Sequence, residues 1–181
     1  MDWSCSSDRQ LVGNTSRNKD YLSSCEKLIK SHPFHLSMNG WTAHDRNCYF
    51  FSSEKQTWFE SRRSCEDLDA HLITINEEKE HVFIASHIKE SFWIGLNDLD
   101  TEGRWVWVNN QTLNETGVQF WHKRNSSSEP DNWKGQDPSG ENCVCLGDVL
   151  KPPNIWFDVS CRHVLKFICE KKNTSLFKDD E

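Results

Sequence analysis

Carboxylate side chains recur in one stretch of the sequence, between residues 128 and 161. They include Glu129, Asp131, Asp137, Glu141 and Asp158. The stretch up to residue 142 is rich in Pro, Gly, Asp, Asn and Ser, a composition that predicts a long loop. Calcium takes six to eight oxygen ligands, mostly carboxylate and carbonyl, so an ordered loop of this kind could hold it. Composition alone favours the plainer interpretation that these acids are solvated.

Several short runs predict the strands that would position this loop. Residues 143–146 and 155–158 are typical of two strands that flank a turn. Residues 48–52 are rich in aromatic side chains and predict a further strand. The continuous apolar run at 92–96 predicts a buried strand, and residues 105–108 predict the next one. The loop is therefore expected to stand on a small sheet.

Two helices are predicted from their first turns. Thr57 followed by Glu60 forms a capping-box pattern, and this helix should extend to about residue 70. Asn76 is a good N-cap for a second helix, which should extend to about residue 89. Two histidines of the second helix are expected at the protein surface or its boundary, not as metal ligands: His81 and His87.

Length and charge limit the classes of protein that this chain can represent. Its 181 residues are enough for one domain with a core, and nine Trp and ten Phe argue against a disordered chain. The net charge of −7 argues against nucleic acid as a partner and against adhesion to anionic membranes. We expect no enzymatic activity, because no Ser-His-Asp phrase, Gly-rich phosphate loop or zinc set is present.

Cysteines and glycosylation signals indicate the compartment. The eight cysteines include no C-x-x-C pair, so disulfides are favoured over zinc. Five sequons predict N-glycosylation, at Asn14, Asn110, Asn114, Asn125 and Asn173. Three of them fall in residues 109–128, expected to be a mobile excursion on one face.

The N-terminus has no leader pattern, and no run is long and apolar enough to span a membrane. We expect an extracellular protein, secreted or the ectodomain of a type II membrane protein. The chain would then be a fragment or isoform without its targeting segment, or an incomplete gene model.

Six short motifs follow one another along the second half of the chain. They are Trp-Ile-Gly-Leu at 93–96, Trp-Val-Trp at 105–107, Glu-Pro-Asp at 129–131, Gly-Glu-Asn-Cys at 140–143, Trp-Phe-Asp at 156–158 and Phe-Ile-Cys-Glu at 167–170. Together they resemble the C-type lectin-like domain family, in its calcium-dependent carbohydrate-recognition form, over about residues 40–171. The resemblance implies an α+β fold, with two helices flanking small antiparallel sheets and a long ligand loop tied by disulfides. The chain would comprise a polar stalk or tail (1–37), the domain (38–171) and a polar tail (172–181).

The resemblance also implies two disulfides, Cys65–Cys169 and Cys143–Cys161. Each would add a few kcal/mol of stability by closing a loop. Cys145 lies two residues after Cys143 and could compete for Cys161. Cys48 lacks the partner that the family usually provides. It could pair with Cys25 or Cys5, or with another chain.

Calcium ligands follow from the same resemblance. The principal site would use Glu129, Asp131, Glu141 and Asp158, and Phe157 stands where the family usually has an Asn ligand. A second site would use Asp98, Glu102, Glu141 and Asn142, with Asn132 where an Asp is common. Pro130 would be cis in the calcium-bound form.

A sugar bound to calcium in this family donates hydrogen bonds to carboxylates and accepts them from amides. Here both usual amide donors are absent, and carboxylates can only accept. The residues expected to contact a ligand are Glu129, Asp131, Asn132, Trp133, Glu141, Asn142 and Asp158. Asn132 and Asn142 lie beside the usual amide positions, and Trp133 could stack on a sugar or simply pack the loop. The initial Glu-Pro favours the mannose, fucose and GlcNAc class.

Two functions follow as hypotheses. The first is a calcium-dependent lectin in innate immune or endocytic recognition, with glycans or glycoproteins as partners. The second is a calcium-independent lectin-like receptor domain that binds a protein ligand, which the Phe at position 157 would favour. Either could act in a disulfide-linked or stalk-mediated oligomer.

Overall fold

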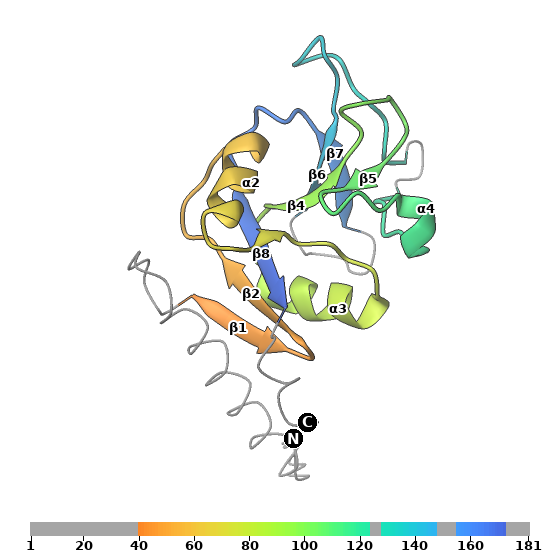
Figure 1. Ribbon diagram of the computed structural model, residues 1–181. Helices are drawn as coiled ribbons and strands as arrows, with labels where there is room; N and C mark the ends of the chain where they lie inside the picture. The colour runs from red at the N-terminus through yellow and green to blue at the C-terminus, as the bar shows by residue number, and fades with distance from the viewer. Residues whose placement is uncertain (1–39, 124–127, 148–154, 173–181) are drawn as a thin grey trace, which may run out of the picture.

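The computed structural model describes residues 40–123, 128–147 and 155–172. Within them the strands are β1 (Trp41–His44), β2 (Asn47–Phe51), β3 (His71–Leu72), β4 (Phe92–Asn97), β5 (Val106–Trp107), β6 (Cys143–Leu146), β7 (Trp156–Val159) and β8 (Lys166–Lys172). The helices are α2 (Trp58–Glu66), α3 (Glu78–His87) and α4 (Leu113–Thr116). Figure 1 shows the loop between α4 and β6 projecting beyond the strands at one end of the molecule.

One hydrogen-bonded path joins these strands, in the order β1-β2-β8-β4-β6-β7, with β3 added to β8 and β5 added to β4. Neighbouring strands are antiparallel except β4 and β8, which run parallel with Phe92 opposite Lys166. The last strand thus enters the centre of the sheet and joins the N-terminal hairpin to the strands that carry the loop. The predicted α+β class is confirmed, although this central pair departs from the expected antiparallel pairing.

The first predicted helix start is correct and the second is not. The Thr57 hydroxyl accepts from the Glu60 amide, and the Glu60 carboxylate accepts from the Thr57 amide, so the capping box is present. Helix α2 ends at Glu66, earlier than expected. Helix α3 begins after Glu77, not Asn76, and no side-chain hydrogen bond caps it; the Asn76 amide donates to the buried Glu80 carboxylate at 3.3 Å.

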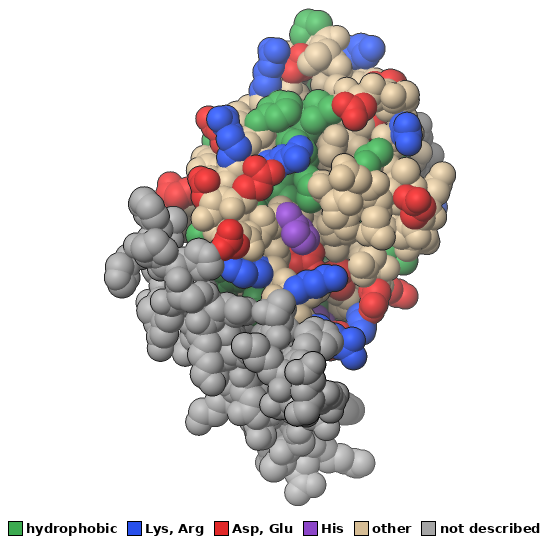
Figure 2. All heavy atoms as spheres, in the orientation of Figure 1, with side chains coloured by type: hydrophobic (Ala, Val, Ile, Leu, Met, Phe, Trp, Pro, Cys, Tyr) green, Lys and Arg blue, Asp and Glu red, His purple; other side chains and the backbone are tan. Residues whose placement is uncertain are grey.

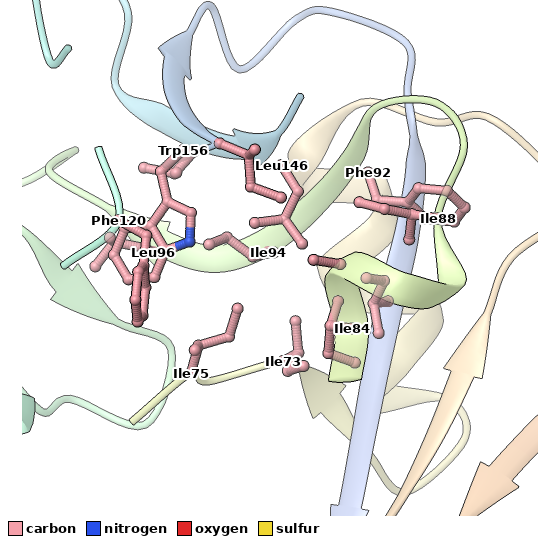
Figure 3. Packing of buried hydrophobic residues seen from close by; sticks show 14 of the residues in the cluster. Ile73, Ile75, Ile84, Ile88, Phe92, Ile94, Leu96, Phe120, Leu146 and Trp156 are labelled. Atoms are coloured by element: carbon pink, nitrogen blue, oxygen red, sulfur yellow. The ribbon is translucent and has the colours of Figure 1, made fainter. Parts of the chain in front are cut away.

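Strand β4 is apolar from Phe92 to Leu96 because both of its faces are buried there. Ile94 and Leu96 belong to one hydrophobic cluster, and Trp93 belongs to a second cluster with Cys65 and Cys169. Figure 3 shows Ile94, Leu96 and Leu146 facing the isoleucines of α3 and of the segment after β3. Alternate residues of a strand point to opposite faces of the sheet. Because both faces are buried here, every residue of the run is apolar.

Gly95 occupies a position in β4 that has no room for a side chain. Its amide donates to the Ile73 carbonyl at 2.9 Å and its carbonyl accepts from Val108 at 2.8 Å. A Cβ atom there would lie 2.8 Å from the Leu72 carbonyl oxygen. Glycine therefore lets β4 approach the segment after β3 closely.

His81 was expected at the surface or its boundary, and this prediction is wrong. The side chain is fully buried, and its ring stacks on Phe120 with centroids 3.8 Å apart. Phe120 and Trp121 are themselves buried beside Trp156. The described part of the expected mobile excursion is therefore anchored to the core by two aromatic rings.

Both implied disulfides are present. Cys65–Cys169 links α2 to β8 across 104 residues, and Cys143–Cys161 links β6 to the segment after β7. Cys145 is a free, buried thiol, so it does not replace Cys143. Cys48 is disulfide-bonded, and its proposed partners Cys5 and Cys25 lie outside the described residues.

Charged side chains are interspersed on the surface. Figure 2 shows acidic and basic groups alternating over one face, without a continuous patch of either sign on that face. No described helix is long and apolar enough to cross a membrane.

Candidate metal centre

Three carboxylates converge where the long loop meets the end of β7. Glu129, Asp131 and Asp158 each offer an oxygen, and these atoms all lie within 4.8 Å of one another. Asp158 is buried, Glu129 is half-buried and Asp131 is exposed, so the cluster opens to solvent on one side. The Glu129–Pro130 peptide bond is cis. Converging carboxylates with an open side suit a hard cation that keeps positions for a further ligand.

Asp158 also holds the first turn of the loop. Its Oδ1 accepts from the Asp131 amide at 3.1 Å, and its Oδ2 accepts from the Asn132 amide at 2.8 Å. Asn132 has a φ of 46°, a left-handed conformation that asparagine tolerates better than most residues. The backbone of the loop is therefore wrapped around a carboxylate predicted to be a ligand.

Glu141 lies beside the three converging carboxylates and closes the far end of the loop. Its Oε2 accepts from the Trp133 amide at 3.0 Å, and its own amide donates to Asn132 Oδ1 at 2.9 Å. Burial raises the pKa of Glu141 to about 7, and the negative charges of Asp158 and Asp131 add to the rise. This repulsion among carboxylates is what a bound cation would relieve.

Phe157 occupies the position where the resemblance implies an oxygen ligand. Its ring stacks on His122 with centroids 4.7 Å apart, and a Cβ atom on Gly147 would overlap the ring. Phe157 pairs with Cys145 across the strands, whereas Asp158 pairs with Val144. The ring is thus packed into place and supplies no oxygen to a metal.

The two asparagines that sequence places beside the site have different contacts. Asn132 uses its Oδ1 within the loop, which leaves its Nδ2 as the donor end. Asn142 donates weakly to the Ser139 carbonyl at 3.4 Å, and its buried Oδ1 has no hydrogen-bond partner. Trp133 is 53% exposed and its ring rests against Gly135.

A second group of oxygens lies on the neighbouring loop. Asp98 is buried, its Oδ2 accepts from the Gly103 amide at 2.7 Å, and its Oδ1 has no hydrogen-bond partner. Its amide donates to the Asn142 carbonyl at 3.1 Å, so the two residues that carry unpartnered oxygens are adjacent. Burial raises the pKa of Asp98 to about 6, and the charge of the exposed Glu102 contributes.

Sequence reasoning missed a second pair of buried carboxylates, Glu80 and Glu170. Tyr49 donates to Glu80 at 2.6 Å, and Asn47 donates to Glu170 at 2.6 Å. These residues lie at or beside a cavity of about 480 Å³ next to the β1–β2 turn, apart from all the predicted ligands. Glu80 lies one turn before the buried Ile84, and that spacing was a signal of burial.

Comparison with known proteins identifies the family. Residues 54–171 match the family model of the lectin C-type domain. The chain is 39% identical over 139 residues to C-type lectin domain family 4 member D of Homo sapiens, covering 75% of this chain and 59% of that protein. The chain thus spans less than two thirds of the length of this relative. The chain belongs to the C-type lectin domain family.

Two solved structures show the same fold. The human scavenger receptor C-type lectin carbohydrate-recognition domain has a TM-score of 0.64 and 32% identity, covering 74% of this chain and 97% of that one. The C-type lectin domain of murine dendritic cell inhibitory receptor 2, solved in complex with an N-glycan, has a TM-score of 0.61 and 29% identity over the same shares. The relatives are lectins and receptors rather than enzymes.

Proposed function

We propose that this domain binds carbohydrate through Ca²⁺ held by Glu129, Asp131, Glu141 and Asp158. The observation that carries the proposal is the convergence of three carboxylates within 4.8 Å at the open end of the loop. Glu141 stands beside them, and its pKa is raised by burial and further by the negative charges of Asp158 and Asp131. Calcium would supply the coordination positions to which sugar hydroxyls bind.

The donor set fits calcium in charge, although Phe157 removes one oxygen. Four carboxylates carry more negative charge than a set in which amide oxygens replace some of them. Charge count is one of the means by which proteins tune calcium affinity, so it offsets part of the lost ligand. The stacked ring of Phe157 would remain in place beside the ion.

A second cation would lie beside Asp98, Glu102, Glu141 and Asn142. Its support is the pair of buried oxygens without partners, Asp98 Oδ1 and Asn142 Oδ1. Buried oxygens of this kind are costly unless a donor or a cation satisfies them. Calcium, which prefers carboxylate and amide oxygens, is the ion that suits this pair.

Sugar recognition would combine the ion with the residues around it. Asn132 Nδ2 would donate to a hydroxyl, since Asn132 Oδ1 already accepts from the Glu141 amide. The exposed face of Trp133 would stack on a sugar ring. We favour glycans of the mannose, fucose and GlcNAc class, and the N-glycan complex of the murine relative supports glycans as partners.

The setting would be extracellular recognition, by a secreted lectin or the ectodomain of an innate immune or endocytic receptor, without catalysis. Asn110 and Asn114 are exposed and available for N-glycosylation, whereas Asn14, Asn125 and Asn173 lie outside the described residues. The chain would form oligomers through its stalk or through a disulfide between chains.

A second candidate, a calcium-independent domain that binds protein, is favoured by one observation, the packed Phe157 ring at a ligand position. A glycan array with the full chain separates the two. We expect calcium-dependent binding that is lost in chelator and in Glu129→Ala but kept in Glu54→Ala, an exposed glutamate outside the loop. Absence of calcium-linked glycan binding by the correctly bridged protein would reject the lectin proposal.

A further inference from the structure

Asp137 lies in the middle of the acidic loop, but its carboxylate is not one of the three that converge. Its Oδ1 accepts from the amide of Ser139 at 3.0 Å and from its hydroxyl at 2.6 Å. Its Oδ2 accepts from the hydroxyl of Ser160, 23 residues further along the chain, at 2.6 Å. Both Asp137 and Ser160 are buried, at 8% and 5% exposure. This carboxylate is therefore fully engaged within the protein.

Neighbouring contacts reinforce this link. The Arg162 amide donates to the Ser160 hydroxyl at 3.3 Å, and the Gly140 amide donates to the Asp137 carbonyl at 2.9 Å. Gln136 and His163 side chains approach within 3.2 Å. The Arg162 guanidinium lies 3.8 Å from Asp137, but it is 81% exposed, so this ion pair contributes little. The hydroxyl of Ser160 is the main connection between the two segments.

The Asp137–Ser160 hydrogen bond lies between the two ends of the loop, and both ends supply proposed ligands. Ser160 follows Asp158 by two residues and precedes Cys161, whose disulfide holds β6. Asp137 lies between Trp133 and Glu141, which are joined to each other by a hydrogen bond at 3.0 Å. Fixing residue 137 against residue 160 thus fixes the part of the loop that neither Asp158 nor Glu141 holds directly.

We propose that the Asp137–Ser160 hydrogen bond positions the acidic loop for its cation, and that Asp137 is a positioning residue and not a ligand. The inference rests on the proposed function. A loop that is ordered before binding loses less conformational entropy when the ion arrives, so its affinity is higher. The carboxylate is suited to this role because its hydrogen bonds from Ser139 and Ser160 hold its pKa well below the usual range, and it stays charged.

The first test is calcium titration calorimetry on the full chain. Ser160→Ala should weaken calcium affinity by about tenfold, the size expected for loss of a hydrogen bond to a charged group. Ser160→Thr keeps the hydroxyl and should restore most of the affinity. Ser53→Ala, at an exposed serine outside the loop, should leave it unchanged. Wild-type affinity in Ser160→Ala would overturn the positioning role.

The second test does not depend on calcium. In chelator, hydrogen exchange at the amides of Trp133, Ser139 and Glu141 should be faster in Ser160→Ala than in the wild type, because these amides are hydrogen-bonded within the loop. Unchanged exchange would overturn the proposal. If the wild type binds no calcium, the proposed function fails by itself, and this exchange experiment still decides whether Asp137 and Ser160 order the loop.

Discussion

The aromatic ring of Phe157 stacks on the imidazole of His122, with ring centroids 4.7 Å apart and ring planes inclined by 25°. The next residue along β7, Asp158, belongs to the converging carboxylates. A packed aromatic ring and a carboxylate of the proposed calcium site are therefore neighbours on one strand. The ring takes the position where the family resemblance implies an oxygen ligand, so in the proposed site this packing would replace a ligand.

Replacing this ring by an amide should exchange stability for calcium affinity. Phe157→Asn removes the stack on His122 and should lower the free energy of unfolding in chelator by about 1–3 kcal/mol. It adds an oxygen beside Asp158 and should raise calcium affinity by about tenfold, or ~1.4 kcal/mol. Calorimetric titration and chelator melts measure the two effects. The control is Phe59→Asn, at an exposed phenylalanine of α2, which should not raise the calcium affinity. An unchanged calcium affinity in Phe157→Asn would show that residue 157 does not face the ion.

The buried pair Glu80 and Glu170 predicts that stability falls as pH rises. Burial raises the pKa of each carboxyl to about 7, above its ordinary 4.5. The native state therefore holds protons that the unfolded chain has lost, and this stabilisation is complete below about pH 4.5 and gone above about pH 7. Chelator melts from pH 5 to pH 8 should show a loss of roughly 1–3 kcal/mol from this pair.

Glu80→Gln isolates this contribution, because an amide there can still accept from Asn76 and donate to the Tyr49 oxygen. It should flatten the pH profile, whereas Glu54→Gln should keep the wild-type slope. Parallel profiles for the wild type and Glu80→Gln would mean that the pair stays ionised in the folded protein.

Gly140 closes the loop in a conformation that only glycine adopts easily. Its φ is 86°, and a Cβ atom there would overlap the Asn132 amide group that accepts from Glu141. Gly140→Ala should cost more stability than the ~1 kcal/mol expected from backbone strain alone, and it should weaken calcium binding. Gly117→Ala is the matched control, since φ there is 75° with open space around it. Equal losses of stability in chelator melts for the two variants, with unchanged calcium affinity, would argue against the Asn132 contact.

Much of the framework could be predicted because it depends on short local patterns. The capping box of α2 needs only Thr57 and Glu60, and the buried strand β4 is visible as an apolar run. The cis bond before Pro130 was expected from the family resemblance. Such features are set by neighbours in sequence, or by a family whose motifs are preserved in order.

Other features depend on contacts between distant residues. His81 is buried because Phe120, 39 positions later, covers it with a stacked ring, and the buried Glu80 accepts a hydrogen bond from Tyr49, 31 positions earlier. The Asp137–Ser160 hydrogen bond joins segments that the Cys143–Cys161 disulfide brings together. No local pattern signals a contact of this kind.

Thermal unfolding of the full chain, with calcium and with EDTA, tests most directly whether the converging carboxylates bind calcium. A ligand that binds only the native state at 100 times its dissociation constant adds about 2.7 kcal/mol, which corresponds to a rise in Tm of several degrees. We predict such a rise in millimolar calcium for the wild type and for Glu54→Ala, and its loss in Glu129→Ala, which removes the side-chain oxygens altogether. An identical Tm in calcium and in EDTA for the wild type would contradict the calcium site and favour a protein ligand at this loop.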